Sequence, residues 1–264
     1  MAVASGLPRG KSTSGDESHW DFFDRIYFKD PQLYHQILKE TFNHTKPYEA
    51  KAYKLLVQIP FRSFVTLNHD ELLPNAFYEF TLKRKPKCNF SVYPGKHPIY
   101  LPSDFSEINQ CLVAIHGCKN QSDDIWYENL ILRWTDYKTH YEGDGPHPTF
   151  LQMWWYWLLT TSPCIFIGTS LKEPGVALTI AKIAEHSNES VRRLKHIHLT
   201  DEPGITFGVL EEIVYDNINK EHTGLVDVLS LASGIKESGP SVTEFRKVQM
   251  TSEFSVGNNN PANI

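Results

Sequence analysis

Polar or small residues follow three short apolar runs, and these positions are the candidates for chemistry. Residues 63–65 are followed by Thr66-Leu67-Asn68-His69-Asp70, residues 112–115 by His116-Gly117, and residues 165–167 by Gly168-Thr169-Ser170. An imidazole exchanges a proton near neutral pH, an amide both donates and accepts hydrogen bonds, and a glycine lets a ligand approach the backbone. Each group alone has a structural explanation as a turn or cap residue. Together they predict a ligand pocket.

These runs belong to a regular alternation of strands and helices. Strands are expected at 63–68, 111–117, 164–170, 194–200 and 211–216. Helices are expected at 18–28, 32–42, 47–59, 149–160, 174–186 and 222–231. This order favours an α/β fold with a Rossmann-like, mostly parallel sheet and flanking helices, in which ligands bind beyond the carboxyl ends of the strands.

The remaining segments carry weaker signals. Residues 71–110 predict the start of a helix and then a small antiparallel excursion, and the basic run 83–87 is interpreted as a solvated loop rather than a nucleic-acid patch. The tryptophans at 154, 155 and 157 have helical spacing and predict core packing. The polar residues 236–264 predict a disordered tail, which leaves 1–235 as one domain with a helical part at about 16–60.

Composition excludes several classes of function. The net charge of −5 argues against a nucleic-acid partner. The most apolar window, 150–159, is shorter than the roughly 20 residues that cross a bilayer, so no membrane span is expected. The four cysteines form no C-x-x-C pair, which argues against a structural metal, and unpaired thiols predict a cytoplasmic protein.

Five segments resemble the sirtuin-like family and occur in the family's order. They are TLNHDELL (66–73), AIHG (114–117), NLILRWTDYKTHY (129–141), FIGTSLKEP (166–174) and IVYDNINKEHTGLVDVLSLA (213–232). The family's first strand ends in G-A-G-x-S and is followed by S-G-[LI]-P, and residues 2–8 (AVASGLP) resemble the end of that stretch. The first strand and its glycines would then precede Met1. We therefore expect a sirtuin-like fold that lacks the first strand.

Several residues depart from the family pattern and indicate which branch of the family the chain resembles. Leu67 replaces the glutamine of the classical deacylases, and the four-cysteine zinc module is missing. Both point to the zinc-free bacterial branch. Arg9-Gly10-Lys11 replaces the usual aromatic and arginine, which puts the loop that covers the cofactor in doubt, and Glu173 stands where aspartate is common.

The resemblance implies a reaction and a set of residues. The reaction is cleavage of the nicotinamide–ribose bond of NAD, which serves as substrate, without a metal. His116 would be the base, and Asn68 and Asp70 would serve the carboxamide end. The nucleotide-binding residues would be Thr66, Gly117, Gly168, Thr169, Ser170 and Pro8.

The expected function is that of an NAD glycohydrolase of the anti-phage-defence type. Alternatives that stay open are an NAD-dependent protein deacylase and a non-catalytic nucleotide-binding or interaction module. With the first strand placed before Met1, we expect little turnover from the chain as written. A homo-oligomer is compatible with this prediction.

Overall fold

The computed structural model describes twelve stretches of the chain. They are residues 19–43, 51–82, 88–93, 110–119, 126–142, 147–169, 171, 174–186, 194–201, 209–215, 223–234 and 246–247. Pro8 and Ser170, both predicted to bind the nucleotide, lie outside the described residues, as does the basic run 83–87.

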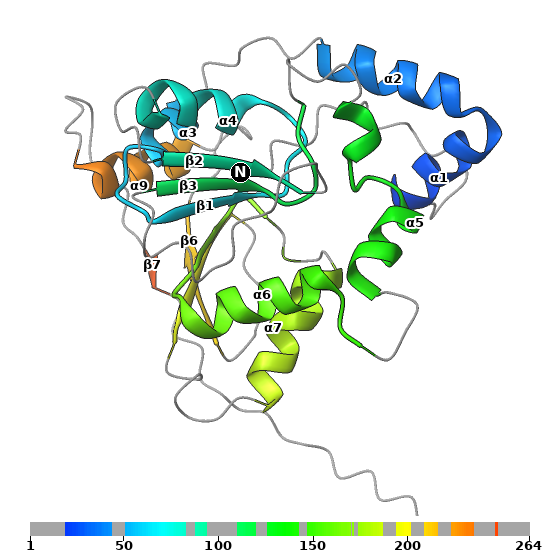
Figure 1. Ribbon diagram of the computed structural model, residues 1–264. Coiled ribbons are helices and arrows are strands. Elements are labelled where there is room, and N and C mark those ends of the chain that lie inside the picture. Colours follow the sequence, from blue (N-terminus) through cyan, green and yellow to red (C-terminus); the bar gives the residue numbers. More distant parts are fainter. Residues whose placement is uncertain are drawn as a thin grey trace, which may run out of the picture.

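Two small sheets form the centre of the molecule (Figure 1). In the first, β1 (Ser63–Thr66), β3 (Gln110–Ala114) and β2 (Cys88–Val92) pair in parallel in the order β1-β3-β2. In the second, β4 (Ile165–Ile167), β5 (His196–Thr200) and β6 (Leu210–Val214) are parallel, and the two-residue β7 (Arg246–Lys247) joins β6 antiparallel. The predicted α/β fold with a mostly parallel sheet is confirmed. Among the described residues, β1 and β4 each have a strand neighbour on one side only.

The described helices are α1 (His19–Lys29), α2 (Pro31–Asn43), α3 (Lys51–Leu56), α4 (Leu72–Phe77), α5 (Trp134–Tyr137), α6 (Phe150–Thr161), α7 (Pro174–His186) and α9 (Thr223–Ser233). Six of them, α1, α2, α3, α6, α7 and α9, lie within or close to predicted ranges; α4 lies where the start of a helix is expected, and α5 was not predicted. A 3-10 turn covers Trp126–Asn129, and π-helical turns follow α4 at Tyr78–Leu82 and α5 at Lys138–Glu142.

Local chemistry explains where two of these helices begin. Asp30 accepts hydrogen bonds from the backbone N–H groups of Gln32 and Leu33, both at 3.0 Å, so Pro31 is the first residue of α2 rather than a break outside it. Thr149 and Gln152 bond reciprocally to each other's backbone N–H at 3.3 and 3.0 Å and start α6 with a capping box.

The same helices cover both sheets. On one face, α6 and α7 pack in one core cluster with Val113 of β3 and Phe166 of β4. On the other face, Leu56 of α3 contacts one cluster that contains Phe64 of β1 and another that contains Leu199 of β5. Trp154 and Trp155 are buried in the first cluster, whereas Trp157 is 40% exposed. The two sheets are therefore flanked by common helix layers (Figure 1).

One sequence-based expectation is wrong. Residues 88–92 were expected in an antiparallel excursion, but β2 pairs in parallel with β3 from Cys88 to Val92. The physical reason is that α4 and the π-helical turn at Tyr78–Leu82 lie between β1 and β2 in the chain, and parallel strands are usually joined by such a helical crossover. The alternating residues of this segment indicate a strand, but no local signal determines whether that strand pairs in parallel or antiparallel.

Candidate nucleotide site

A cavity of about 910 Å³ lies between β1 and β4, and we call it the inter-sheet cavity. Its walls include every residue from Ser63 to Asn68 and every residue from Cys164 to Thr169. Thr66, Asn68, Gly168 and Thr169, which were predicted from separate strand ends, thus border one space. These four residues lie at the carboxyl ends of the strands, beyond which ligands bind in parallel α/β sheets.

The carboxyl ends of the two sheets share one edge. Gly175, at the start of α7, donates its backbone N–H to the hydroxyl of Tyr137. The Tyr137 ring in turn lies 6.4 Å from the ring of His116, which follows β3. Leu171, which follows β4, packs in the same cluster as Ile131, whose N–H bonds to the carbonyl of His116 at 2.9 Å. The segments after β3 and β4 are therefore linked through Tyr137 and belong to one core cluster.

Asn68 is held in place from the end of β1. Its backbone N–H donates to Thr66 Oγ1 at 3.1 Å, a local turn that fixes the chain as it leaves the strand. Its side-chain Nδ2 donates to the hydroxyl of Tyr53 at 3.3 Å, and burial raises the pKa of that phenol, so the hydroxyl stays protonated. An amide has two N–H groups and an acceptor oxygen, so this bond leaves capacity for a ligand amide.

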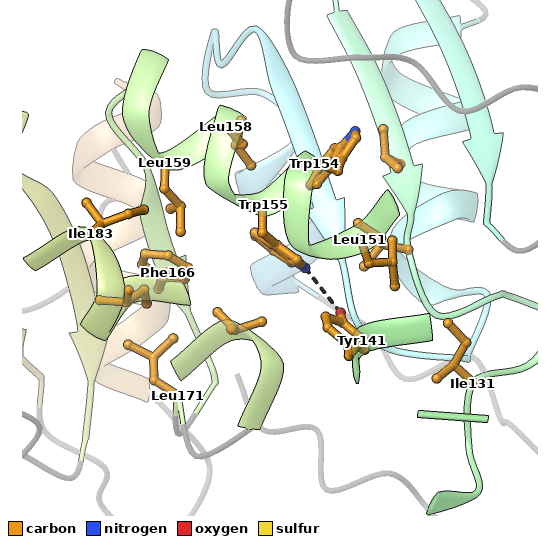
Figure 2. Packing of buried hydrophobic residues seen from close by; sticks show 14 of the residues in the cluster. Ile131, Tyr141, Leu151, Trp154, Trp155, Leu158, Leu159, Phe166, Leu171 and Ile183 are labelled. Carbon is orange, nitrogen blue, oxygen red and sulfur yellow. Dashed lines mark hydrogen bonds between the residues drawn. The ribbon is translucent and has the colours of Figure 1, made fainter. Parts of the chain in front are cut away.

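His116 is buried behind the cavity rather than in its wall. Its side chain is only 2% exposed, and Nε2 lies 2.8 Å from the hydroxyl of Tyr141. Trp155 Nε1 donates to the same hydroxyl at 3.1 Å (Figure 2). An indole can only donate, so the Tyr141 oxygen accepts from Trp155 and its proton is available to His116 Nε2. This arrangement favours the tautomer with the proton on Nδ1.

A second histidine stacks on the first. The rings of His69 and His116 lie 6.1 Å apart at an interplanar angle of 30°. His69 Nε2 is 3.1 Å from the carbonyl of Ile131, which can only accept, so this nitrogen carries the proton. His69 thus ties the end of β1 to the end of β3.

Asp70 and Gly117 have structural partners in this arrangement. Asp70 Oδ1 accepts from the N–H of Leu72 at 2.9 Å at the start of α4, and burial raises the pKa of the carboxyl group above its usual value. Gly117 has φ +82°, and a Cβ there would lie 2.2 Å from the carbonyl oxygen of Asn129. Neither residue borders the inter-sheet cavity. Their placement at the strand ends agrees with the prediction, but their contacts are with the protein itself.

Sequence reasoning missed a buried pair beside Thr169. His198 Nε2 lies 2.8 Å from the carbonyl oxygen of Thr169, and Nδ1 lies 3.3 Å from Glu212 Oε1. Both side chains are buried. The pair fixes the end of β4 from the neighbouring strands β5 and β6. The available signal was Glu212 within a predicted strand, because a carboxylate inside a sheet needs a partner.

The cavity wall also contains a thiol that is not a nucleophile. Cys164 borders the cavity at the start of β4, and burial raises its pKa to about 12. Because only the thiolate attacks, this cysteine stays inert near neutral pH. Cys118 is buried as well, and its Sγ–H donates to the carbonyl of Asp70 at 3.2 Å.

Comparison with known proteins gives the family. The model of the SIR2-like domain matches residues 62–217, which include β1 to β6 and the whole carboxyl edge described above. The chain belongs to the SIR2-like family. A search of curated proteins gives no match. SIR2-like domains use NAD, so the ligand class of this SIR2-like chain is an NAD-type nucleotide.

The described residues of this SIR2-like chain show neither a metal site nor a membrane span. Within the described stretches, no group of three or more His, Cys, Asp or Glu side chains is placed to hold a metal ion. The described helices are all too short or too polar to cross a bilayer. The resemblance to the sirtuin-like family is confirmed by the family match.

Proposed function

We propose that this SIR2-like chain binds NAD at the carboxyl edge of the inter-sheet cavity and cleaves its nicotinamide–ribose bond by hydrolysis. One observation carries the proposal. Thr66 and Asn68 of one sheet and Gly168 and Thr169 of the other border a single cavity, at the end of parallel strands where nucleotides bind. The volume of about 910 Å³ is at the upper end of the range for small-molecule sites.

The two ends of the nucleotide need different partners. The nicotinamide end carries a carboxamide, and the Asn68 amide can both donate to it and accept from it. The adenosine end carries hydroxyls and phosphates, for which the Thr169 hydroxyl and the backbone at Gly168 are suited. The Thr169 side-chain oxygen already accepts the N–H of Leu171 at 3.1 Å, and a hydroxyl can still donate to a ligand.

Hydrolysis places modest demands on the protein. Nicotinamide leaves as a neutral base from a cationic ring, and the transition state resembles the oxocarbenium ion of glycoside hydrolysis. The protein must orient the ribose, exclude stray water and position one water molecule. We assign the base for that water, or for a ribose hydroxyl, to His116; the tautomer with the proton on Nδ1 would leave Nε2, 2.8 Å from the Tyr141 hydroxyl, as the basic nitrogen.

The burial of His116 favours a second candidate, a nucleotide-binding module without turnover. Its Nε2 is bonded to Tyr141, and the residue is not part of the cavity wall. In that case the family's ligand would bind, but the base would not reach it. The deacylase alternative differs from hydrolysis in the acceptor, which is an acyl-lysine instead of water.

Product analysis separates these functions. NAD is incubated with the chain, with and without an acyl-lysine peptide, and nicotinamide and ADP-ribose are quantified by chromatography. Free ADP-ribose without peptide supports hydrolysis, peptide-dependent nicotinamide release supports deacylation, and ADP-ribose binding without release supports the module. Under hydrolysis, His116→Ala lowers turnover by about 10²–10⁴-fold.

Asn68→Ala sharpens the same experiment. We expect lost turnover with ADP-ribose affinity unchanged within a few-fold, because the contact is assigned to the nicotinamide end. Asn75→Ala is the matched control, because Asn75 is exposed on α4 and does not border the cavity. The biological setting that we propose, an NAD-hydrolysing effector of anti-phage defence in the cytoplasm, follows from the resemblance alone.

A further inference from the structure

A second, smaller pocket lies between α6, α7 and the π-helical turn at Lys138–Glu142, and we call it the tyrosine pocket. Its volume is about 320 Å³, at the lower end of the range for small-molecule sites, so it suits a ligand with a single ring. No described residue borders both this pocket and the inter-sheet cavity. The tyrosine pocket is therefore a separate space from the proposed nucleotide site.

Two helices provide the walls of the tyrosine pocket. On α6, Gln152 and Tyr156 are four residues apart, and on α7, Gly175, Thr179 and Lys182 follow at intervals of four and three. Each set lies on one face of its helix, because residues three and four apart are neighbours on a helix surface. The two helices pack in one core cluster (Figure 1), so the pocket occupies the groove between their facing sides.

Stacked tyrosine rings form the floor of this groove. Tyr137 and Tyr141 are both buried, and their rings lie 4.4 Å apart at an interplanar angle of 17°. Gly175 allows α7 to approach them closely, since a Cβ at this position would lie only 2.2 Å from a ring carbon of Tyr141. Because the floor is already packed and bonded, a ligand would not have to order it on binding.

The upper walls present apolar surface that a ligand can cover. Tyr156 and Met153 of α6 border the pocket, and each is 51% exposed. An aromatic ring gains from contact with both, because aromatic rings pack against one another in defined geometries and a thioether sulfur favours the edge of a ring. The wall chemistry therefore selects an aromatic ligand.

Opposite charges border the same pocket. Glu142 follows the tyrosine floor, Lys182 lies one turn beyond Thr179 on α7, and both side chains are exposed. A ligand with a single charge would be attracted by one of these groups and repelled by the other. A zwitterion can place its ammonium group toward Glu142 and its carboxylate toward Lys182, which makes it the complementary ligand.

We propose that the tyrosine pocket is a second ligand site, which binds a zwitterionic ligand with one aromatic ring, the chemistry of an aromatic α-amino acid. The ring packs against Tyr156 and Met153, and the two charged groups of the ligand face Glu142 and Lys182. This inference goes beyond nucleotide binding and does not depend on turnover of NAD.

The floor of the pocket connects the ligand to His116. The Tyr141 hydroxyl is bonded to His116 Nε2 at 2.8 Å and to Trp155 Nε1 at 3.1 Å (Figure 2). Trp155 in turn borders the inter-sheet cavity. A ligand that contacts the Tyr141 ring thus lies one side chain away from the candidate base, and the imidazole signals of His116 should report its binding.

Chemical-shift mapping of the full chain with L-phenylalanine as the probe tests the proposal. We expect the amide signals of Gln152, Tyr156 and Thr179 to shift, while those of Asn68 and Gly168 stay in place. Phenethylamine, which lacks the carboxylate, and phenylacetate, which lacks the ammonium group, should bind up to about fivefold more weakly, because exposed ion pairs contribute little.

Charge variants assign each end of the probe. Lys182→Gln should weaken phenylalanine and strengthen phenethylamine, and Glu142→Gln should weaken phenylalanine and strengthen phenylacetate, each by up to about fivefold. Lys54→Gln on α3 and Glu79→Gln on the turn after α4 are the matched controls, because both side chains are exposed and neither borders the pocket.

Ring variants separate binding from its report at His116. Tyr156→Ala should weaken all three probes by about two- to tenfold, whereas Tyr78→Ala, at a tyrosine that is 55% exposed outside the pocket, should not. Tyr141→Phe keeps the floor ring, so phenylalanine should still shift the Thr179 amide, but the response of the His116 imidazole should be lost.

Three results would overturn the proposal. The first is that phenylalanine shifts no amides of α6 and α7. The second is that its shifts centre on Asn68 and Gly168, which would place the ligand in the inter-sheet cavity. The third is that phenethylamine or phenylacetate binds as tightly as phenylalanine, which would show that Glu142 and Lys182 do not select a zwitterion.

Discussion

Two buried histidines, one after the first sheet and one within the second, show how hydrogen-bond partners determine the chemistry of a side chain. His116 follows β3 and bonds through Nε2 to the hydroxyl of Tyr141 at 2.8 Å. His198 lies within β5 and faces oxygen on both sides, the Thr169 carbonyl at 2.8 Å and Glu212 at 3.3 Å. A carbonyl only accepts, so His198 uses its proton to hold the end of β4. His116 keeps a nitrogen that can accept a proton. One histidine is an anchor, and the other is a candidate base.

The largest expected effect concerns the backbone that positions His116. Gly117→Ala would place a Cβ 2.2 Å from the carbonyl oxygen of Asn129 and hold alanine at φ +82°. We expect a loss of about 3 kcal/mol or more in the free energy of unfolding, measured by chemical denaturation. Gly234→Ala is the control, because it has φ +72° with nothing within 4 Å and should lose only about 1 kcal/mol. Equal losses would show that the clash at Gly117 is relieved at little cost.

Removing the partner of the anchoring histidine should have the next largest effect. Glu212→Ala leaves His198 Nδ1 without its carboxylate in a buried site, at a cost of about 1–3 kcal/mol. Glu212→Gln keeps an acceptor oxygen and should lose less. Glu211→Ala, at the half-buried neighbouring position, provides the control. An unchanged unfolding free energy in Glu212→Ala would show that the bond between His198 and Glu212 does not stabilise the fold.

Tyr141→Phe tests the other histidine. It deletes the hydroxyl shared by His116 and Trp155 and should cost about 1 kcal/mol. Nitrogen-15 NMR of the imidazole should show His116 with the proton on Nδ1 in the unmodified chain and a change of tautomer in the variant. Tyr93→Phe breaks a comparable bond to His140 at 2.9 Å and should leave the His116 signals in place. A proton on Nε2 of His116 in the unmodified chain would contradict the assigned tautomer.

The smallest effect is a change in pH dependence. Burial raises the pKa of folded Asp70 above its ordinary value of 3.8, so ionisation of the carboxyl group opposes folding. The cost is absent below about pH 3.8, grows as the pH rises to the folded pKa, and then stays constant. Asp70→Asn keeps an acceptor for Leu72 and should raise the unfolding free energy at pH 7, by less than about 1 kcal/mol, relative to pH 3. Asp70→Ala, without the acceptor, should lose stability at both pH values. If Asp70→Asn lost more unfolding free energy at pH 7 than at pH 3, ionised Asp70 would stabilise the folded chain, and the proposed effect of its burial would be wrong.

Much of the fold follows from local patterns in the sequence. The apolar runs before Asn68, His116 and Gly168 are strands, and the ranges of α6 and α7 agree with the expected ones within one residue. These elements carry strong local signals, such as the capping box at Thr149 and an apolar run that ends in glycine. The direction of β2 has no such signal, because pairing depends on the path of the chain between strands.

The candidate site was predictable in its position but not in its contacts. The positions of Thr66, Asn68, Gly168 and Thr169 at strand ends predicted that they border one pocket, because the carboxyl ends of parallel strands lie at the same edge of a sheet. They did not show that His116 lies outside the cavity wall and bonds to Tyr141, because Tyr141 comes from a segment after β3. The pairing of His198 with Glu212 was equally hidden, as it depends on the register between β5 and β6.

Chemical-shift mapping with ADP-ribose tests most directly whether an NAD-type nucleotide binds at the carboxyl edge of the inter-sheet cavity, between the ends of β1 and β4. We expect saturating ADP-ribose to shift the amide signals of Thr66, Leu67 and Asn68 together with those of Gly168 and Thr169. The amides of α2, at the outer end of the molecule, should stay unchanged (Figure 1). Binding that shifts only one of the two strand ends, or no shift at either, would contradict the claim.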